Sequence, residues 1–398
     1  MASSPNQNRR ALYTCYAAMM CLAIALNFLP VYLTTFSYAF GEGPGLTGEQ
    51  LGRIPAVMFF SFIVAILMTG PLADRTDARR FVLAGLLTTM AGLGLVAFAP
   101  SYGFLLFAVA VMGFGAGVLD MILSPVVAAL QPERSGAAMN WLHAFFCLGA
   151  VGAVVIASVA LKWEISWRWV GVGIMAVPFL TFICFLGLSL PPLLKDAGQR
   201  EPMTALMKQP YFIACLLAIF LGGATETGLS QWLPGYVELN LGFSKETGGF
   251  VLAGFSVGMV IGRVSAAMLQ NRIPPLSLMF WCCAATAILF VVISFPPGPA
   301  VAIAASLAAG FTGSCLWPTM LAVSSDAWPN GGATMFSVLT AFGNAGCSLI
   351  PWLVGIIMEY SDLHIGLLAV TLCPAGMMLI LLWMSRQPLR ADSPGQGA

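Results

Sequence analysis

Residues 113–152 read GFGAGVLDMILSPVVAALQPERSGAAMNWLHAFFCLGAVG, two apolar helical stretches joined by a short charged turn. Asp120 lies near the middle of the first stretch, and His143 lies inside the second, three residues after Asn140. An ionised carboxylate in hydrocarbon is costly, so such residues usually face a water-filled cavity or bind a proton. The stretch therefore predicts a membrane protein with a functional site at or beside Asp120.

The composition of the whole chain agrees with this interpretation. Of its 398 residues, 59% are hydrophobic and 8% are charged, whereas a soluble domain carries about 25% charged residues. The net charge of +1 gives no indication of nucleic-acid binding, so the lipid bilayer is the expected partner. The ten cysteines all fall in apolar segments, and we expect them to be reduced packing residues rather than a disulfide framework or a zinc site.

Twelve apolar stretches are long enough to cross a bilayer, for which about 20 residues are needed. The longest connection between them, residues 191–210, is polar, so we expect a six-span half at 1–190, a cytoplasmic linker, and a second half at 211–398. The predicted spans are 12–39, 50–72, 81–99, 104–130, 138–161, 168–190, 211–237, 247–269, 275–295, 299–324, 333–358 and 365–385.

The distribution of basic residues predicts the orientation. With twelve spans, 13 of the 17 Lys and Arg residues fall on the side of the two termini and 4 on the other side. Lys and Arg are in excess in cytoplasmic loops. We therefore expect a multi-pass protein of the inner membrane with both termini in the cytoplasm.

The two halves of the chain resemble each other. Residues 45–52, GLTGEQLG, match residues 242–249, GFSKETGG, at an offset of 197. Gly113-Phe114 matches Gly310-Phe311 at the same offset, and residues 135–139 match 331–335 at an offset of 196. A parallel repeat of two six-helix halves is typical of rocker-switch transporters with a central site. In this all-α architecture a pseudo-two-fold axis relates the two halves. The twelve spans of one chain form a complete pathway, so a monomer is expected.

The connection between the second and third spans carries a recognisable motif. Its sequence, Gly70-Pro-Leu-Ala-Asp-Arg-Thr-Asp-Ala-Arg-Arg80, resembles the signature loop of the major facilitator superfamily, roughly G-x-L-x-D-R-x-G-R-R. The resemblance implies the major facilitator fold and a role in gating, because a carboxylate and arginines at helix ends can clamp a cytoplasmic gate. The implied gating residues are Gly70, Asp74, Arg75, Arg79 and Arg80. The alternative is an ordinary basic cytoplasmic loop.

Asp120 and Glu226 are the acidic residues that the sequence places deep in spans, and no Lys or Arg is expected deep in any span. Burial favours the protonated form of an unpaired carboxylate, and water entry would release the proton. We therefore predict ion coupling through Asp120, Glu226 and His143, with the proton as the ion and sodium as the alternative. The structural alternatives are a hydrogen bond from Asp120 to Ser124, local bonds of Glu226, and a neutral core histidine.

Other polar or aromatic side chains interrupt the apolar spans and are candidates for binding a substrate. Amide and carboxylate groups beside aromatic faces suit a sugar, and the absence of a deep cation favours a neutral polyol over an anion. The alternative for each is a hydrogen bond between helices. The substrate candidates are Asn27, Tyr32, Ser124, Asn140, Gln231, Trp232, Trp317 and Asn344.

A set of residues in four spans forms a pattern similar to the fucose–proton symporter and glucose transporter branch of the superfamily. The set is Asp120, Ser124-Pro125, Asn140, His143, Phe146 and Gly149-Ala150, with Glu226, Trp232, Tyr236 and Gly262-Arg263. The resemblance implies that Asp120 matches the carboxylate of proton coupling. It implies proton symport of a neutral sugar or similar small polar solute by alternating access.

The alternative function is proton-driven export of drugs or amphipathic compounds. Exporters of that type often carry a proline in the fifth span, and the stretch LGAVGAVVIAS at 148–158 has none. No nucleophile elbow, phosphate loop or metal-ligand cluster is evident in the sequence, so we expect neither an enzyme nor a cofactor or bound metal.

Overall fold

The computed structural model describes residues 5–73, 77–131, 135–190, 202–269, 272–328 and 331–387. Within these residues it contains twelve helices, or pairs of helices, long and apolar enough to cross a membrane. Each of the twelve predicted spans overlaps one of them, which confirms the all-helical membrane fold. Residues 191–201, most of the predicted linker, lie outside the described part of the chain.

The first half contains spans one to six. Span one is broken into two helices by a 3-10 turn containing Pro30, which has no backbone N–H to give to a helix. Span six is also built from two helices, α7 and α8. The elements are α1 (Pro5–Asn27), η1 (Leu29–Tyr32), α2 (Leu33–Phe40), α3 (Gly48–Ala73), α4 (Ala78–Ala97), α5 (Tyr102–Leu130), α6 (Ser135–Lys162), α7 (Trp167–Ile174) and α8 (Ala176–Leu186).

The second half repeats this plan after the short helix α9 (Met203–Leu206). Span seven is broken near Pro234, and spans ten and twelve are also built from two helices each. The elements are α10 (Pro210–Ser230), α11 (Leu233–Leu239), α12 (Lys245–Leu269), α13 (Pro275–Ser294), α14 (Pro299–Gly313), α15 (Leu316–Ala327), α16 (Gly332–Tyr360), α17 (Leu363–Val370) and α18 (Leu372–Ser385).

Equivalent contacts in the two halves support the internal repeat. A Cβ on Gly113 of α5 would overlap the carbonyl oxygen of Met58 in α3, and a Cβ on Gly310 of α14 would overlap that of Phe255 in α12. Both members of the second pair lie 197 residues after those of the first. Glycine is needed at both places because the helix backbones touch. The offset found in the sequence therefore relates contacts in space as well.

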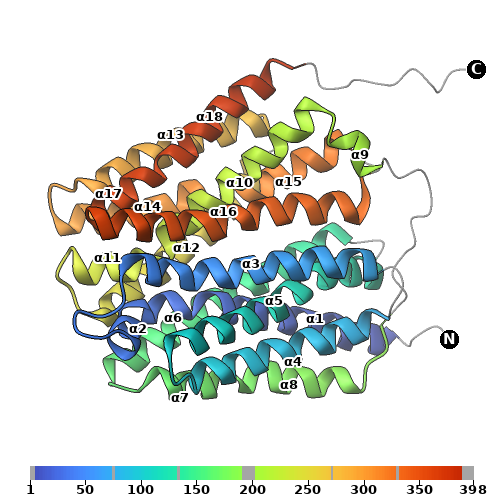
Figure 1. Cartoon of the computed structure of the whole chain (residues 1–398). Coiled ribbons are helices and arrows are strands. Elements are labelled where there is room, and N and C mark those ends of the chain that lie inside the picture. Colours follow the sequence, from blue (N-terminus) through green and yellow to red (C-terminus); the bar gives the residue numbers. More distant parts are fainter. Residues whose placement is uncertain are drawn as a thin grey trace, which may run out of the picture.

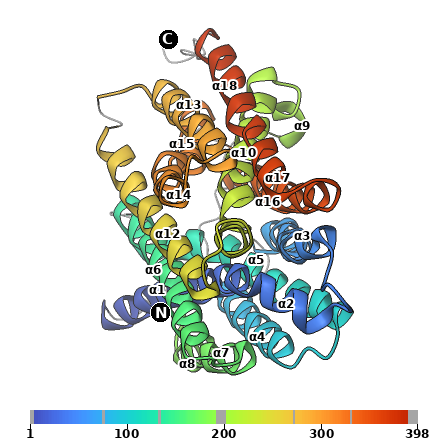
Figure 2. The ribbon, with the colours of Figure 1, turned by 90° about the vertical axis from the view of Figure 1, so that its left-hand side faces the viewer.

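The two halves lie against each other as two layers, with both chain termini at one end of the bundle (Figure 1). The layers meet mainly where α3 lies along α16 and where α6 lies along α12. Figure 2, a view along the bundle, shows α11 close to the first half. We call the end that carries residues 41–47 and 240–244, opposite the termini, the far end.

Candidate functional site

Asp120 lies near the middle of α5 and is half-buried. Among the residues that the structure describes, no hydrogen bond or ion pair reaches its carboxylate. The predicted alternative, a bond to Ser124 one turn later, is not formed, and Ser124 is half-buried as well. Pro125 lies inside α5 and has no N–H for the carbonyl four residues earlier, which leaves a further polar group at this level.

The neighbours of Asp120 place it beside the boundary between the halves. Gly117, one turn earlier, lies against Phe62 of α3 in the same half. The sulfur of Met121 accepts a hydrogen bond from the Ser337 hydroxyl of α16, in the other half, at 3.2 Å. Asp120 is therefore an acidic group that no described residue bonds, and it is adjacent to a residue that bridges the two halves.

Glu226 of α10 has a different environment. Its carboxylate forms an ion pair with Arg263 of α12 at 3.3 Å, and both side chains are about one quarter exposed, at 24% and 25%. The expectation that no Arg lies deep in a span is therefore wrong at Arg263, which lies six residues inside the end of α12. The count of basic residues used for the orientation includes Arg263 among those on the side of the two chain termini. Its long side chain instead brings the charged group to Glu226.

Arg263 also connects the two halves. Its Nε donates to the carbonyl oxygen of Ser314 at 3.3 Å, within the second half. Its Nη1 lies 3.7 Å from the sulfur of Cys147 in α6, which belongs to the first half. The Arg263 guanidinium thus directs a different N–H group to each of Glu226, Ser314 and Cys147.

His143 lies one turn before Cys147 on α6 and is exposed rather than enclosed in the core. Cys147, one turn later on the same helix, contacts Arg263, and no contact between His143 and Asp120 occurs within the described part of the chain. His143 is thus placed with the Glu226–Arg263 pair. The side chain of Asn140, its predicted companion, lies outside the described residues.

Two of the predicted substrate residues make local bonds only. The amide nitrogen of Asn27 donates to the Ala23 carbonyl at 2.8 Å, and that of Asn344 donates to the Thr340 carbonyl at 2.9 Å. Each bond links residues four apart on one helix and leaves the amide oxygen free to accept a hydrogen bond.

Tyr32 and Trp232 are buried and join helices. The Tyr32 hydroxyl donates to the Ala157 carbonyl of α6 at 3.2 Å, and the Trp232 indole donates to the Pro351 carbonyl of α16 at 2.9 Å. Gln231 is only 6% exposed. For Tyr32 and Trp232 the structure favours the alternative of helix–helix bonding.

Trp317 occupies in the second half the position of Asp120 in the first, 197 residues later. It is half-buried, and its ring lies against Gly223 of α10 and Gly343 of α16, where any Cβ would overlap it. The pseudo-two-fold axis therefore relates an acidic group in one half to an aromatic face in the other.

The described part of the signature loop holds its own half together. Asp77 caps α4 by accepting from the Arg79 backbone N–H at 3.1 Å, and the Arg79 side chain donates to the carbonyls of Phe185 and Leu186 at the end of α8. Arg80 is exposed.

Gly70 belongs to the boundary between the halves. A Cβ there would come within 2.8 Å of the Ser337 hydroxyl oxygen in α16, so a larger residue would press on the other half. Asp74 and Arg75, the remaining predicted gating residues, lie outside the described part of the chain.

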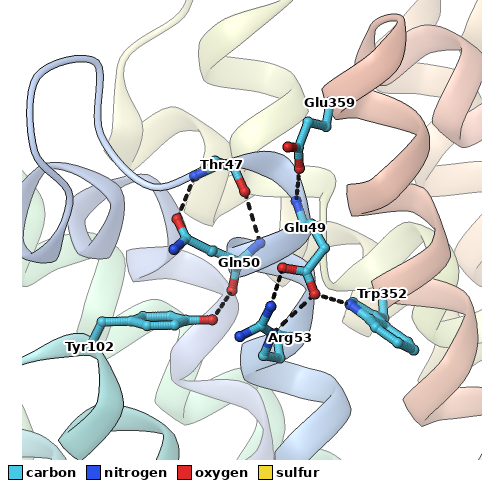
Figure 3. Close-up of polar contacts among 7 residues, drawn as sticks. All are labelled: Thr47, Glu49, Gln50, Arg53, Tyr102, Trp352 and Glu359. Carbon is cyan, nitrogen blue, oxygen red and sulfur yellow. Dashed lines mark hydrogen bonds and ion pairs between the residues drawn. The ribbon is translucent and has the colours of Figure 1, made fainter.

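A polar network at the far end joins α3 to α16 (Figure 3). The Glu49 carboxylate accepts from the Trp352 indole at 2.6 Å and from Arg53 Nε at 3.0 Å. The Glu359 carboxylate accepts from the Glu49 backbone N–H at 3.3 Å. Two elements about 300 residues apart in sequence are thus joined through two carboxylates, those of Glu49 and Glu359.

A second bridge at the far end joins α2 to α11. The Thr34 hydroxyl donates to Glu238 at 2.6 Å, and Lys245 lies 3.8 Å from the other oxygen of Glu238. Lys245 also lies over the Tyr38 ring at 5.0 Å. We call the two bridges together the far-end latch; its residues are Thr34, Tyr38, Glu49, Arg53, Glu238, Lys245, Trp352 and Glu359.

The far-end latch is not predicted by the sequence. Glu49 and Lys245 lie in the matching repeats 45–52 and 242–249, which marks these segments, but nothing local indicates their partners. Within the described residues, no group of three or more His, Cys, Asp or Glu residues could hold a metal ion.

Curated relatives match most of the chain. A probable nitrate/nitrite transporter, NarK2 of Mycobacterium tuberculosis, is 25% identical over 354 residues, 83% of this chain and 86% of that protein. A purine ribonucleoside efflux pump, NepI of Shigella sonnei, is 27% identical and covers 68% of this chain and 67% of its own. A putative glucose/galactose transporter of Helicobacter pylori is 22% identical, with 70% and 73% covered.

Solved structures share the fold over nearly the whole chain. A bacterial homologue of the human lysosomal transporter Spinster, inward-facing and occupied, superposes with a TM-score of 0.82 at 15% identity, over 99% of this chain and 100% of the other. A D-xylose–proton symporter gives 0.80 at 12% identity, over 96% and 98%. The transporter FucP in the outward conformation gives 0.68 at 20%, over 95% and 99%.

A family model matches residues 13–351 and 240–397, and its matches together extend over both halves. The matched segments contain Asp120, the Glu226–Arg263 pair and the far-end latch. The chain is a member of the Major Facilitator Superfamily of membrane transporters.

Proposed function

We propose that this transporter couples the movement of a small neutral polar solute, with a sugar as the leading class, to the movement of protons through Asp120. The observation that carries the proposal is the half-buried carboxylate in the middle of α5, which none of the described residues bonds. A carboxylate at this depth is stabilised either by water or by a proton. Alternating access changes its contact with water, so the same group can take up a proton on one side and release it on the other.

The environment of Glu226, the second acidic residue, supports the proposal that Asp120 alone exchanges protons. Glu226 is compensated by Arg263, so the pair is neutral overall and can remain ionised through the cycle. His143 and Cys147, beside Arg263, belong to the opposite half. The boundary between the halves at this level is therefore where we place solute binding, with Asp120, Ser124 and Trp317 as further contacts.

The Glu226–Arg263 pair is also the reason why we propose a neutral solute. Arg263 is present deep in the second half, contrary to the sequence expectation, but its charge is already matched by Glu226. An anionic solute would have to displace Glu226, whereas a hydroxyl can accept from the guanidinium without breaking the pair. The D-xylose–proton symporter and the putative glucose/galactose transporter among the similar proteins support a sugar.

The orientation completes the proposal. We propose that the protein lies in an inner membrane with both termini in the cytoplasm, because basic residues are in excess on the side of the termini. The far-end latch then closes the pathway on the outer side, and the signature loop lies on the inner side. We take 1–190 and 211–398 as the two moving units, joined by the linker 191–210.

A reconstituted system tests the proposal. Purified protein in vesicles is given an inward proton gradient and radiolabelled glucose, xylose or fucose, and accumulation above equilibrium is measured. Asp362→Asn is a matched control, because Asp362 caps α17 at the far end and Asn is an equally good cap. Accumulation of a sugar by the wild type and by this control supports the proposal. The thermal unfolding temperature of the purified protein is also measured with added sugars and with added lipophilic cations. If only lipophilic cations raise it and no sugar accumulates, the exporter alternative replaces the proposal.

A further inference from the structure

A groove of about 580 Å³ lies on the outer surface of the first half, away from Asp120 and from Arg263. Its floor is α1 and its walls are α6 on one side and α7 with α8 on the other. The lining is almost entirely apolar and includes Met20, Gly152, Ile156, Trp163, Trp169 and Gly173.

The groove opens toward the bilayer and not toward the second half. On α6, Cys147 and Ser158 lie three turns apart and face α12, where they contact Arg263 and Gly249. Ile156, in the groove, is two residues from Ser158 and therefore about 200° away around the helix. The groove and the contact with the second half thus use opposite faces of α6.

Two glycines keep the groove open. A Cβ on Gly152 or on Gly173 would meet no atom within 4 Å. Gly149 lies where α6 meets the floor of the groove. A Cβ there would lie 2.7 Å from the Met20 carbonyl oxygen, so the glycine lets α6 approach α1 closely. An apolar gap of this kind in a membrane is filled by hydrocarbon, because an empty one would lose dispersion contacts on every wall.

One end of the groove has the features of a membrane interface. Trp163 and Trp169 are 70% and 71% exposed, and tryptophan is enriched where hydrocarbon meets headgroups. Lys162, adjacent to the lining residue Trp163, is exposed and forms no hydrogen bond or ion pair within the described residues. Two cations, Lys162 and Arg168, stand near the single carboxylate of Glu164. Arg168 donates to the Ala97 and Ala99 carbonyls, so the ammonium of Lys162 is the group that can meet an anionic headgroup.

We propose that the groove binds one anionic phospholipid. One acyl chain lies over Met20 between α6 and α8, and the phosphate lies beside Lys162 and Trp163. The bound lipid packs against the face of α6 opposite the one that carries Cys147 and contacts α12. This site is separate from the proposed solute site, and its test does not depend on transport.

Native mass spectrometry of the full-length protein, titrated with phosphatidylglycerol in a mild detergent, tests the site. Gly152→Leu and Gly173→Leu place a side chain in the open space and are expected to weaken lipid binding about tenfold, because each replaces contacts of at least two methylene groups. Gly103→Leu is the matched control: its Cβ also meets nothing within 4 Å, but it lies on α5 outside the groove. This control is expected to bind lipid as the wild type does.

Lys162→Gln tests the headgroup. It is expected to remove the preference for phosphatidylglycerol over phosphatidylcholine while an acyl chain still binds. Thermal unfolding without added lipid shows whether each variant is folded, and two groove variants are used so that one misfolded protein does not decide the result. The proposal is overturned if both folded groove variants bind phosphatidylglycerol as tightly as Gly103→Leu does. It is also overturned if the wild type retains only detergent, or if Lys162→Gln keeps the preference.

Discussion

Asp120 in the first half and Glu226 in the second are both half-buried carboxylates near the middle of a membrane span, yet their surroundings differ. Glu226 shares an ion pair with Arg263, while no partner within the described residues reaches Asp120. A compensated carboxylate can stay charged without exchanging a proton. An uncompensated one must be wet or protonated. The contrast supports our proposal that Asp120 exchanges protons and that the Glu226 pair has a structural or solute-binding role.

The largest expected effect comes from Asp120→Asn. The amide keeps the size of the side chain and cannot ionise, so accumulation driven by a proton gradient should be abolished while exchange of solute across the membrane continues. Uptake into vesicles, with and without the gradient, and counterflow of preloaded solute measure the two activities. Full uphill uptake by this variant would remove Asp120 from the coupling mechanism.

Arg263→Met should be the next most damaging change. It leaves Glu226 buried without its cation, which should lower the free energy of unfolding by about 1–3 kcal/mol. Adding Glu226→Gln removes the stranded charge, so the double variant should be more stable than Arg263→Met alone. Thermal unfolding of the two single variants and the double variant measures the coupling. Strictly additive losses would mean that the ion pair does not stabilise the protein.

A smaller effect is expected at the far-end latch, which also joins the halves but away from Asp120. Trp352→Phe removes the indole donor to Glu49 and keeps an aromatic ring. Loss of one hydrogen bond to a charged group is worth about 1.5–3 kcal/mol when buried and less at this partly exposed site. The variant should therefore open more readily at the far end and show a several-fold higher apparent affinity for solute added there.

The reciprocal substitution checks the origin of that effect. Glu49→Gln weakens the same hydrogen bond from the acceptor side and should change the apparent affinity in the same direction, and the two changes should not add. An apparent affinity for solute added at the far end that is unchanged from the wild type in both variants would show that the latch does not hold the far end closed.

The smallest effect should follow Ser124→Ala. The Ser124 hydroxyl does not bond to Asp120, so coupling should be retained and the free energy of unfolding should change by less than about 0.5 kcal/mol. The pH dependence of uptake by this variant, compared with the wild type, measures the result. A large shift would indicate that Ser124 does hold the Asp120 carboxylate, and the contrast with Glu226 would then weaken.

The fold could be predicted from the sequence because its signals are local. A hydrophobic stretch identifies a span wherever it lies, and the repeat at an offset of 197 indicates two similar halves, in which Gly113 and Gly310 make equivalent contacts. The pairings at the site could not be predicted in this way. Arg263 is 37 residues from Glu226, and Glu49 is 303 residues from Trp352. Helix packing alone brings such partners together.

The candidate residues also show which sequence signals are ambiguous. A polar side chain in an apolar span was read as part of a cavity, but Tyr32 and Trp232 use their polar atoms to join helices. Hydropathy does not distinguish these two uses, because both place one polar atom in an apolar segment. Asp120 is distinguished from them by the absence of a bonded partner among the described residues, which is visible only in three dimensions.

The most direct test of proton coupling through Asp120 is to measure proton movement itself. A pH-sensitive dye outside lightly buffered vesicles reports proton uptake when a transported sugar is added without any imposed gradient. The wild type should make the external solution more alkaline as the sugar enters, and Asp120→Asn should admit the sugar with no change in pH. Proton uptake by Asp120→Asn equal to that of the wild type, for the same amount of sugar, would contradict the account.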